Sequence, residues 1–182
     1  KDIKAADKIV NTRDAKDFAL RLNLESMVLL KNKNSILPLD KAKLKSVLVT
    51  GPLANATNYT ISRYGPSNHN SISVLEGLKA YSKNIKVEYA KGCEMVNEGF
   101  PGTELIGREE TEVEKRSINE AVEKAKAVDV IIAVVGEDEQ MVGESLSRTS
   151  LELPGHQLKL LKALHATGKP VIAVLVNGRP LT

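Results

Sequence analysis

Three short apolar runs rich in valine and isoleucine recur along the chain, each closed by glycine or proline. They are residues 46–52 (SVLVTGP), 129–137 (DVIIAVVGE) and 169–180 (KPVIAVLVNGRP). Their apolar positions are nearly continuous, whereas a strand with one wet face alternates apolar and polar residues. The pattern predicts strands covered on both faces, as in a parallel sheet. A fourth run at 85–92 (IKVEYAKG) alternates, and we expect it nearer a sheet edge.

Helical patterns separate these runs, at residues 73–83, 112–128 and 154–168. In the last of them, leucines recur at spacings of three and four residues, and a glycine and a proline then end the pattern. Alternation of strand and helix is typical of a doubly wound fold. We therefore predict an α/β protein, a three-layer α/β/α sandwich with a mostly parallel sheet. Right-handed crossovers would bring the carboxyl ends of its strands to one edge, where such folds bind ligands.

The first forty residues follow a different pattern. Residues 15–32 (AKDFALRLNLESMVLLKN) place apolar side chains at helical spacing, which predicts one long amphipathic helix able to lie against another domain. We expect residues 1–40 to be a helix and linker segment and residues 41–182 to form the sandwich domain. A sheet of three or four strands is thin, so we expect the sandwich to be truncated and more polypeptide to follow.

Composition argues against two classes of binding partner. The 182 residues carry 26 basic and 23 acidic side chains, and the basic ones are scattered, which argues against a nucleic-acid partner. No apolar run approaches the roughly 20 residues of a membrane helix, which argues against a membrane partner. The single cysteine, Cys93, has no partner for an internal disulfide, and we expect it to be a packing thiol.

Known catalytic and cofactor motifs are missing from the sequence. The loop after the first strand run has neither phosphate-binding pattern, and Pro52 removes an amide donor there, so nucleotide binding is disfavoured. That loop is either a plain surface turn or one that presents Arg63 and Tyr64 to a polar ligand. The GESLS segment lacks the second glycine of a serine elbow. The three histidines are isolated in the sequence and do not show the spacing of metal ligands. We expect no cofactor and no metal.

Acidic residues gather after the second strong strand run. Glu137 and Asp138 follow the strand directly, in the position that faces ligands in such folds, and Glu144 stands seven residues beyond Glu137, between glycine and serine. Acids in loops are usually solvated, because loops run over the surface. The residues alone therefore leave two alternatives open, a solvated cluster and a ligand-facing one.

Seven ordered segments of the sequence resemble a known domain. They are NLESMVLLKNKNSILPLD, VLVTGPLAN, SVLEGLK, EYAKGC, INEAVEKAKAVDVIIAVVGE, GESLSRTSLELPGHQLKLLKAL and GKPVIAVLVNGRPL. In this order they resemble the C-terminal α/β sandwich domain of family 3 glycoside hydrolases, the β-glucosidase and β-xylosidase group. SRTSLELPG and NGRPL are similar in particular to bacterial periplasmic β-glucosidases. The resemblance covers the chain from about Arg21 to its end.

The resemblance implies a role for the acidic loop. In the family an N-terminal (β/α)8 barrel carries an aspartate nucleophile and the sandwich domain supplies an acid/base glutamate, which corresponds here to Glu144. Retaining hydrolysis needs these two carboxyl groups about 5 to 5.5 Å apart. Glu137 corresponds to a supporting glutamate that could accept loop amides or pair with Arg148. Arg63 and Tyr64 correspond roughly to a loop that reaches the sugar, although an acid or asparagine is commoner than Arg63 there.

The resemblance also sets the expected function. It implies a retaining β-glycosidase, a β-glucosidase by preference, that acts on terminal β-linked sugars of oligo- or disaccharides in the periplasm or outside the cell. Without the barrel, the chain alone is expected to be inactive. Asp138, Glu139 and Glu152 are then ordinary surface charge. The alternative is a non-catalytic carbohydrate-binding or interaction module on the same fold, with idle acids.

Overall fold

The structure is a computed structural model that describes residues 3–10, 12–58 and 71–182. The chain divides into two compact units, Lys1–Leu39 and Asp40–Thr182. Within the described residues, no helix is long and apolar enough to cross a membrane.

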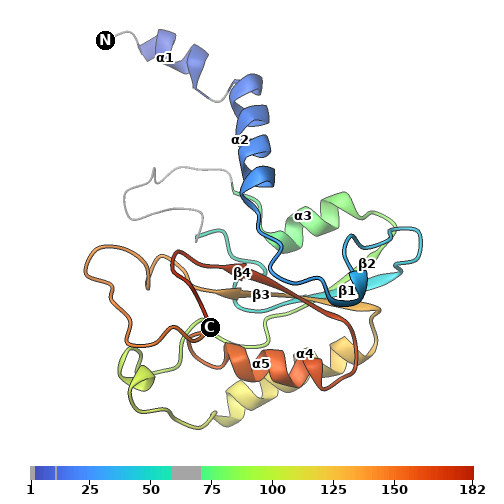
Figure 1. Cartoon of the computed structure of the whole chain (residues 1–182), viewed down its shortest axis with the longest axis vertical. Helices are drawn as coiled ribbons and strands as arrows, with labels where there is room; N and C mark the ends of the chain where they lie inside the picture. Colours follow the sequence, from blue (N-terminus) through green and yellow to red (C-terminus); the bar gives the residue numbers. More distant parts are fainter. Residues whose placement is uncertain (1–2, 11, 59–70) are drawn as a thin grey trace. The chain divides into compact units, whose positions relative to one another are not determined.

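A four-stranded parallel sheet forms the centre of the second unit in the described part of the chain (Figure 1). Its order is β2-β1-β3-β4, and each neighbouring pair runs parallel. The predicted parallel sheet is confirmed, and the alternating run lies at the edge as expected, because β2 pairs with β1 only. The strands are β1 (Ser46–Thr50), β2 (Lys86–Ala90), β3 (Val130–Gly136) and β4 (Val171–Val176).

Helices cover both faces of this sheet and complete the predicted α/β/α layers. Helix α3 (Val74–Tyr81) lies on one face, and α4 (Glu112–Lys126) and α5 (Gln157–His165) lie on the other (Figure 1). Right-handed crossovers require this division, since the chain moves from β1 to β2 in one direction and from β2 through β3 to β4 in the other. Capping boxes start α3 and α4, with a serine or threonine N-cap and a glutamate at N3.

The core lies between the sheet and the α4 and α5 layer. Every residue of β3 is buried, which explains why its sequence is apolar without alternation. Cys93 is 2% exposed within this core, and burial raises the pKa of its thiol to about 12. The prediction of a packing thiol is confirmed. The core cluster consists of Leu48, Ala90, Cys93, Ile118, Ala121, Ala125, Val128, Ile131, Ala133, Leu160 and Leu164.

Two glycines end the central strands. Gly51 follows β1 with a φ of +102°, and Gly136 ends β3 with a φ of +139°. A Cβ atom on Gly136 would lie 1.8 Å from the carbonyl oxygen of Val176 on β4, and one on Gly51 would lie 2.2 Å from that of Val134 on β3. Only glycine combines this conformation with such close backbone approach. The sequence therefore fixes where both central strands stop and their loops begin.

The first unit is helical and carries exposed apolar side chains. It contains α1 (Ile3–Ile9), α2 (Arg13–Ser26) and a short 3₁₀ turn at Lys33–Ser35. The prediction of one helix over residues 15–32 is wrong beyond Ser26, because Met27 is extended, with a φ of −71° and a ψ of 130°. The side chain of Asn32 bonds both backbone groups of Leu37, which fixes a turn that begins at the end of the predicted range.

Candidate functional site

The strand order reverses between β1 and β3, and loops leave both strands at their carboxyl ends. In open α/β sheets this is the position at which ligands bind. Asn58, in the loop after β1, donates through Nδ2 to both carboxylate oxygens of Glu139, at 2.8 Å each. These hydrogen bonds therefore join the loop after β3, residues 137–156, to the loop after β1 at the point where the strand order reverses.

Glu137 is the buried anchor of the loop after β3. Its side chain is fully buried, and its backbone N–H donates to the carbonyl of Val176 at 2.8 Å. Its Oε1 accepts a hydrogen bond from Arg148 Nη1 at 2.9 Å and lies 3.2 Å from Arg179 Nε. Of the two alternatives for Glu137, the structure shows the ion pair with Arg148. Charges this deeply buried are stable only when paired.

Arg148 joins Glu137 to two further segments. Its Nε donates to Glu104 Oε1 at 2.6 Å, and its Nη2 donates to the carbonyl of Glu152 at 2.8 Å. Only 3% of the Arg148 side chain and 7% of the Glu104 side chain are exposed. Burial raises the pKa of Glu104, but the hydrogen bonds from Arg148 and Thr149 outweigh it and hold that pKa below its ordinary value. The charges of two acids and two arginines thus balance in this cluster, which consists of Glu104, Glu137, Arg148 and Arg179.

Asp138 starts the turn that follows. It is 5% exposed, and its Oδ1 accepts from the backbone N–H of Gln140 at 3.0 Å. Burial raises the pKa of Asp138 above its ordinary value. The expectation that Asp138 and Glu139 are surface charge is wrong for Asp138, because the strand end buries it. Glu139 is half-buried, whereas Glu152 is exposed as expected.

Glu144 lies exposed in the loop after β3. Its neighbours Gly143 and Ser145 both have positive φ, of +138° and +65°, which fixes a tight turn at this position. Arg179 Nη2 donates to the carbonyl of Met141 at 2.6 Å and to that of Leu146 at 3.3 Å, on either side of Glu144. Arg179 thus holds the backbone that carries Glu144 from both sides.

Gln157 connects the site to α5. Its buried side chain accepts from the N–H of Gly136 at 2.8 Å and donates to the carbonyls of Gly136 at 3.0 Å and Met95 at 3.1 Å. Sequence reasoning missed this residue and also missed Glu104 and Arg179. A signal existed for Gln157, since it precedes Leu160 and Leu164 at helical spacing and so occupies the apolar face of α5.

Several predicted residues fall elsewhere. Arg63, Tyr64 and His69 lie outside the described residues. Among the described residues, no group of three or more His, Cys, Asp and Glu side chains is placed to hold a metal ion. His156 is buried at the start of α5, and burial lowers its pKa although Glu114 lies 3.7 Å away.

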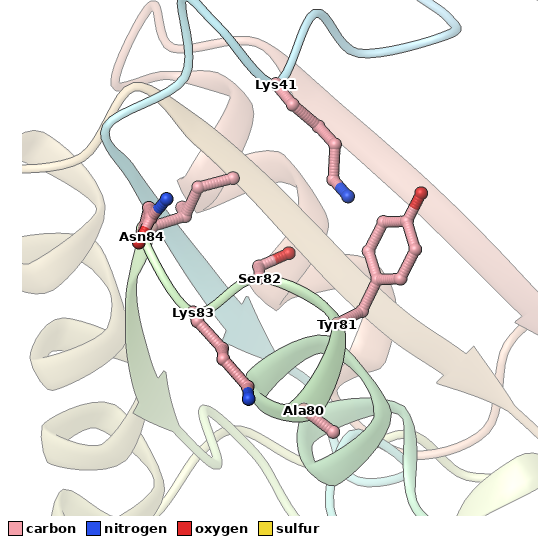
Figure 2. Close-up of a pocket in the computed structure, with 7 residues that line it drawn as sticks. Lys41, Ala80, Tyr81, Ser82, Lys83 and Asn84 are labelled. Atoms are coloured by element: carbon pink, nitrogen blue, oxygen red, sulfur yellow. The ribbon is translucent and has the colours of Figure 1, made fainter.

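A surface hollow of about 310 Å³ lies near the opposite edge of the sheet (Figure 2). It is formed at the end of α3 and the start of β2, so it faces the amino ends of the strands. The ammonium group of Lys41 stands over the Tyr81 ring, 3.3 Å from its centre. None of the loop acids lines this hollow, and the candidate site is therefore the carboxyl edge. The residues that line the hollow are Lys41, Ala80, Tyr81, Ser82, Lys83, Asn84 and Ile85.

Fold and site together define a doubly wound α/β domain that presents an acidic turn at the carboxyl edge of its sheet. Residues 27–182 match the family model of the glycosyl hydrolase family 3 C-terminal domain. The chain belongs to this family, as the resemblance of its seven segments implied.

Named relatives agree with this assignment. A β-xylosidase from Formosa agariphila is 39% identical over 94% of this chain and 22% of its own length. A periplasmic β-glucosidase from Salmonella typhimurium is 38% identical over 97% of this chain and 23% of its own length. This chain therefore spans about a quarter of these relatives.

Solved structures show the same fold. A β-glucosidase from Erythrobacter marinus superposes with a TM-score of 0.79 at 32% identity, over 97% of this chain and 25% of that chain. A family 3 exo-β-xylosidase in complex with a xylobiose aziridine probe gives a TM-score of 0.76 at 31% identity, over 93% of this chain and 20% of that chain.

Proposed function

We propose that this chain is the C-terminal domain of a retaining β-glycosidase and supplies Glu144 as the acid/base residue to a (β/α)8 barrel. The observation that carries this proposal is the position of Glu144, exposed on a braced turn at the ligand-binding edge of the sheet. A general acid must reach the glycosidic oxygen of a substrate held by another surface, so it has to project from its own domain. Buried Glu137 cannot reach outward, because two arginines hold it.

The partner surface is the barrel, which would provide the nucleophile and most contacts to the sugar. Helix α2 supports this proposal, because Phe18, Leu20, Leu22 and Leu24 are each more than half exposed on it. Apolar side chains that continue around a helix are typical of one buried on several sides. We therefore expect the isolated chain to be inactive, since retaining hydrolysis needs two carboxyl groups about 5 to 5.5 Å apart.

The proposed substrate is a di- or oligosaccharide with a terminal β-linked sugar. The relatives include enzymes named β-glucosidase and β-xylosidase at nearly equal identity. We propose β-glucosidase activity, which the initial rates on nitrophenyl β-glucoside and nitrophenyl β-xyloside would test in the full-length enzyme. A clear preference for the xyloside would reassign the sugar without changing the role of Glu144.

A periplasmic or secreted location is also proposed. The Salmonella relative is named periplasmic, and this supports the proposal. Cell fractionation followed by immunodetection would test it in the source organism, and recovery of the enzyme with cytoplasmic markers would contradict it.

The test of the catalytic role is Glu144→Gln in the full-length enzyme. Disaccharide hydrolysis should fall by about 10² to 10⁴-fold, because the leaving group loses its proton donor. Dinitrophenyl glycosides need no protonation, so they should still form the glycosyl-enzyme, and azide should rescue its breakdown. Glu152→Gln is the matched control, since Glu152 is an exposed acid of the same loop and should leave turnover unchanged.

One outcome would remove the proposal. If Glu144→Gln hydrolyses the disaccharide at the wild-type rate, Glu144 is not the acid/base residue. Saccharide binding without any hydrolysis by the full-length protein would favour the alternative, a non-catalytic carbohydrate-binding module.

A further inference from the structure

Arg179 joins the end of β4 to both limbs of the turn that carries Glu144. Its Nη2 donates to the carbonyls of Met141 at 2.6 Å and Leu146 at 3.3 Å, while its Nε lies 3.2 Å from Glu137 Oε1. Met141 precedes Glu144 by three residues, and Leu146 follows it by two. One guanidinium group therefore closes the base of this six-residue segment and fixes its ends to each other.

The segment that contains Arg179 is itself held in place. Asn177 Nδ2 donates to the carbonyl of Arg179 at 2.6 Å, and a Cβ atom on Gly178 would lie 3.0 Å from Val142 Cγ1. The backbone after β4 thus passes close to the loop, and a side chain at Gly178 would have to displace the Val142 methyl group. Arg179 follows the end of β4, so the brace comes from outside the loop.

The charge of Arg179 is matched by the same cluster. Its side chain is 24% exposed, and the fully buried Glu137 carboxylate is its ion-pair partner. Arginine suits this place because its planar fork presents several donors in fixed directions, and here it serves two carbonyls and one carboxylate. Lysine would keep the charge near Glu137 but cannot reproduce this geometry.

We infer that Arg179 is a positioning residue that holds the turn of Glu144 in the position and orientation required for proton transfer. This inference rests on the proposed acid/base role of Glu144. A misplacement of a catalytic group by about 1 Å can cost about 10²-fold in rate, so a residue that touches no substrate can still control turnover.

The test compares two substrates in the full-length enzyme. Arg179→Gln should lower kcat/KM for the disaccharide about 10²-fold, with a much smaller effect on kcat/KM for a dinitrophenyl glycoside. Breakdown of the glycosyl-enzyme should slow as well, and azide should restore it. Arg179→Lys should lie between the wild type and Arg179→Gln, because it keeps the charge and loses the double carbonyl contact. If Arg179→Gln does not fold, Arg179→Lys carries the test.

Arg108→Gln is the matched control. The Arg108 side chain is 25% exposed and is also bound to a glutamate, Glu114, but its other hydrogen bonds go to the carbonyls of Glu98 and Glu109, away from the turn. A purely structural arginine should affect both substrates equally, without azide rescue, and we expect this pattern for Arg108→Gln.

Two results would overturn the inference. One is wild-type disaccharide turnover in Arg179→Gln, and the other is an equal loss on both substrates that azide does not restore. If Glu144→Gln separates the two substrates and the Arg179 variants do not, only this inference fails. If Glu144→Gln itself retains wild-type turnover, the proposed function fails first.

Discussion

Replacing Glu137 by glutamine tests whether the buried charges hold the acidic loop in place. Glutamine keeps the shape of the side chain and an oxygen that can accept from Arg148 and Arg179, but it removes the negative charge. In the wild type that oxygen lies 2.9 Å from Arg148 Nη1 and 3.2 Å from Arg179 Nε, with the Glu137 side chain fully buried. The substitution therefore isolates the charge from the packing.

The magnitude can be worked out contact by contact. A hydrogen bond to a charged group contributes about 1.5 to 3 kcal/mol, and the arginines keep their charge when glutamine accepts from them, so each of the two contacts loses only part of this, about 1 kcal/mol. Arg148 keeps Glu104 as a second acid, and Arg179 is 24% exposed, so neither arginine is left wholly unpaired. The free energy of unfolding should therefore fall by about 2 to 3 kcal/mol. A buried charge that loses its only partner costs more, about 3 to 5 kcal/mol.

Urea unfolding of the chain, followed by circular dichroism, would measure this loss. Glu123→Gln is the control, because Glu123 pairs with Lys126 on an exposed part of α4 and should change the free energy of unfolding by less than about 0.5 kcal/mol. A loss below about 1 kcal/mol for Glu137→Gln would refute the reasoning, because the arginines would then be satisfied without the carboxylate.

Other parts of the fold give shorter tests. Gln157→Leu removes the hydrogen bonds of this side chain to Gly136 and Met95 and should cost about 2 to 4 kcal/mol in urea unfolding; an unchanged midpoint would contradict this. Gly136→Ala would place a Cβ atom 1.8 Å from the Val176 carbonyl, so we expect the variant to lack the circular dichroism of the folded chain. The buried Cys93 thiol, whose pKa burial raises to about 12, should resist Ellman's reagent until urea unfolds the chain, and rapid labelling of the native chain would count against its burial. Hydrogen bonds from Arg108 lower the pKa of Glu114 from 4.5 to about 2, so its contribution to stability is present above pH 4.5 and is lost as pH falls toward 2. In Glu114→Gln the free energy of unfolding should fall less steeply over this window, and a slope equal to the wild type would disprove the linkage.

Local pattern was enough to predict the sheet. The run at 129–137 became β3, Val130–Gly136, because seven consecutive buried positions leave no polar face that a different element could expose. The same logic failed for the N-terminal helix after Ser26. There the apolar spacing continued, but the backbone is extended at Met27, and the side chain of Asn32 then bonds the backbone of Leu37 in a separate turn.

The buried cluster could not be predicted, because its contacts are made across the topology. Arg148 meets Glu104, 44 positions away, and Arg179 meets Met141, 38 positions away. The contact of Arg179 forms only once β4 lies beside β3, and local sequence carries no sign of either pairing. The pairing of Glu137 with Arg148 was within reach, since they are 11 positions apart in one loop. The role of Glu144 came from family resemblance, whereas the physics of its loop left two alternatives open.

The two acids Glu137 and Glu144 of this loop differ in burial, which suits them to different roles. An acid that must be rigid is best buried and paired, as Glu137 is, but a paired carboxylate with no exposed surface cannot transfer a proton to a substrate. An acid that must reach a substrate has to be exposed, as Glu144 is in this domain, and a general acid also needs surroundings that favour its protonated form. The buried cluster resolves the first demand by fixing the turn. Under the proposed function the second demand falls on the barrel surface, so the rigidity of the loop can be measured in this domain, whereas the proposed chemistry has to be measured in the full-length enzyme.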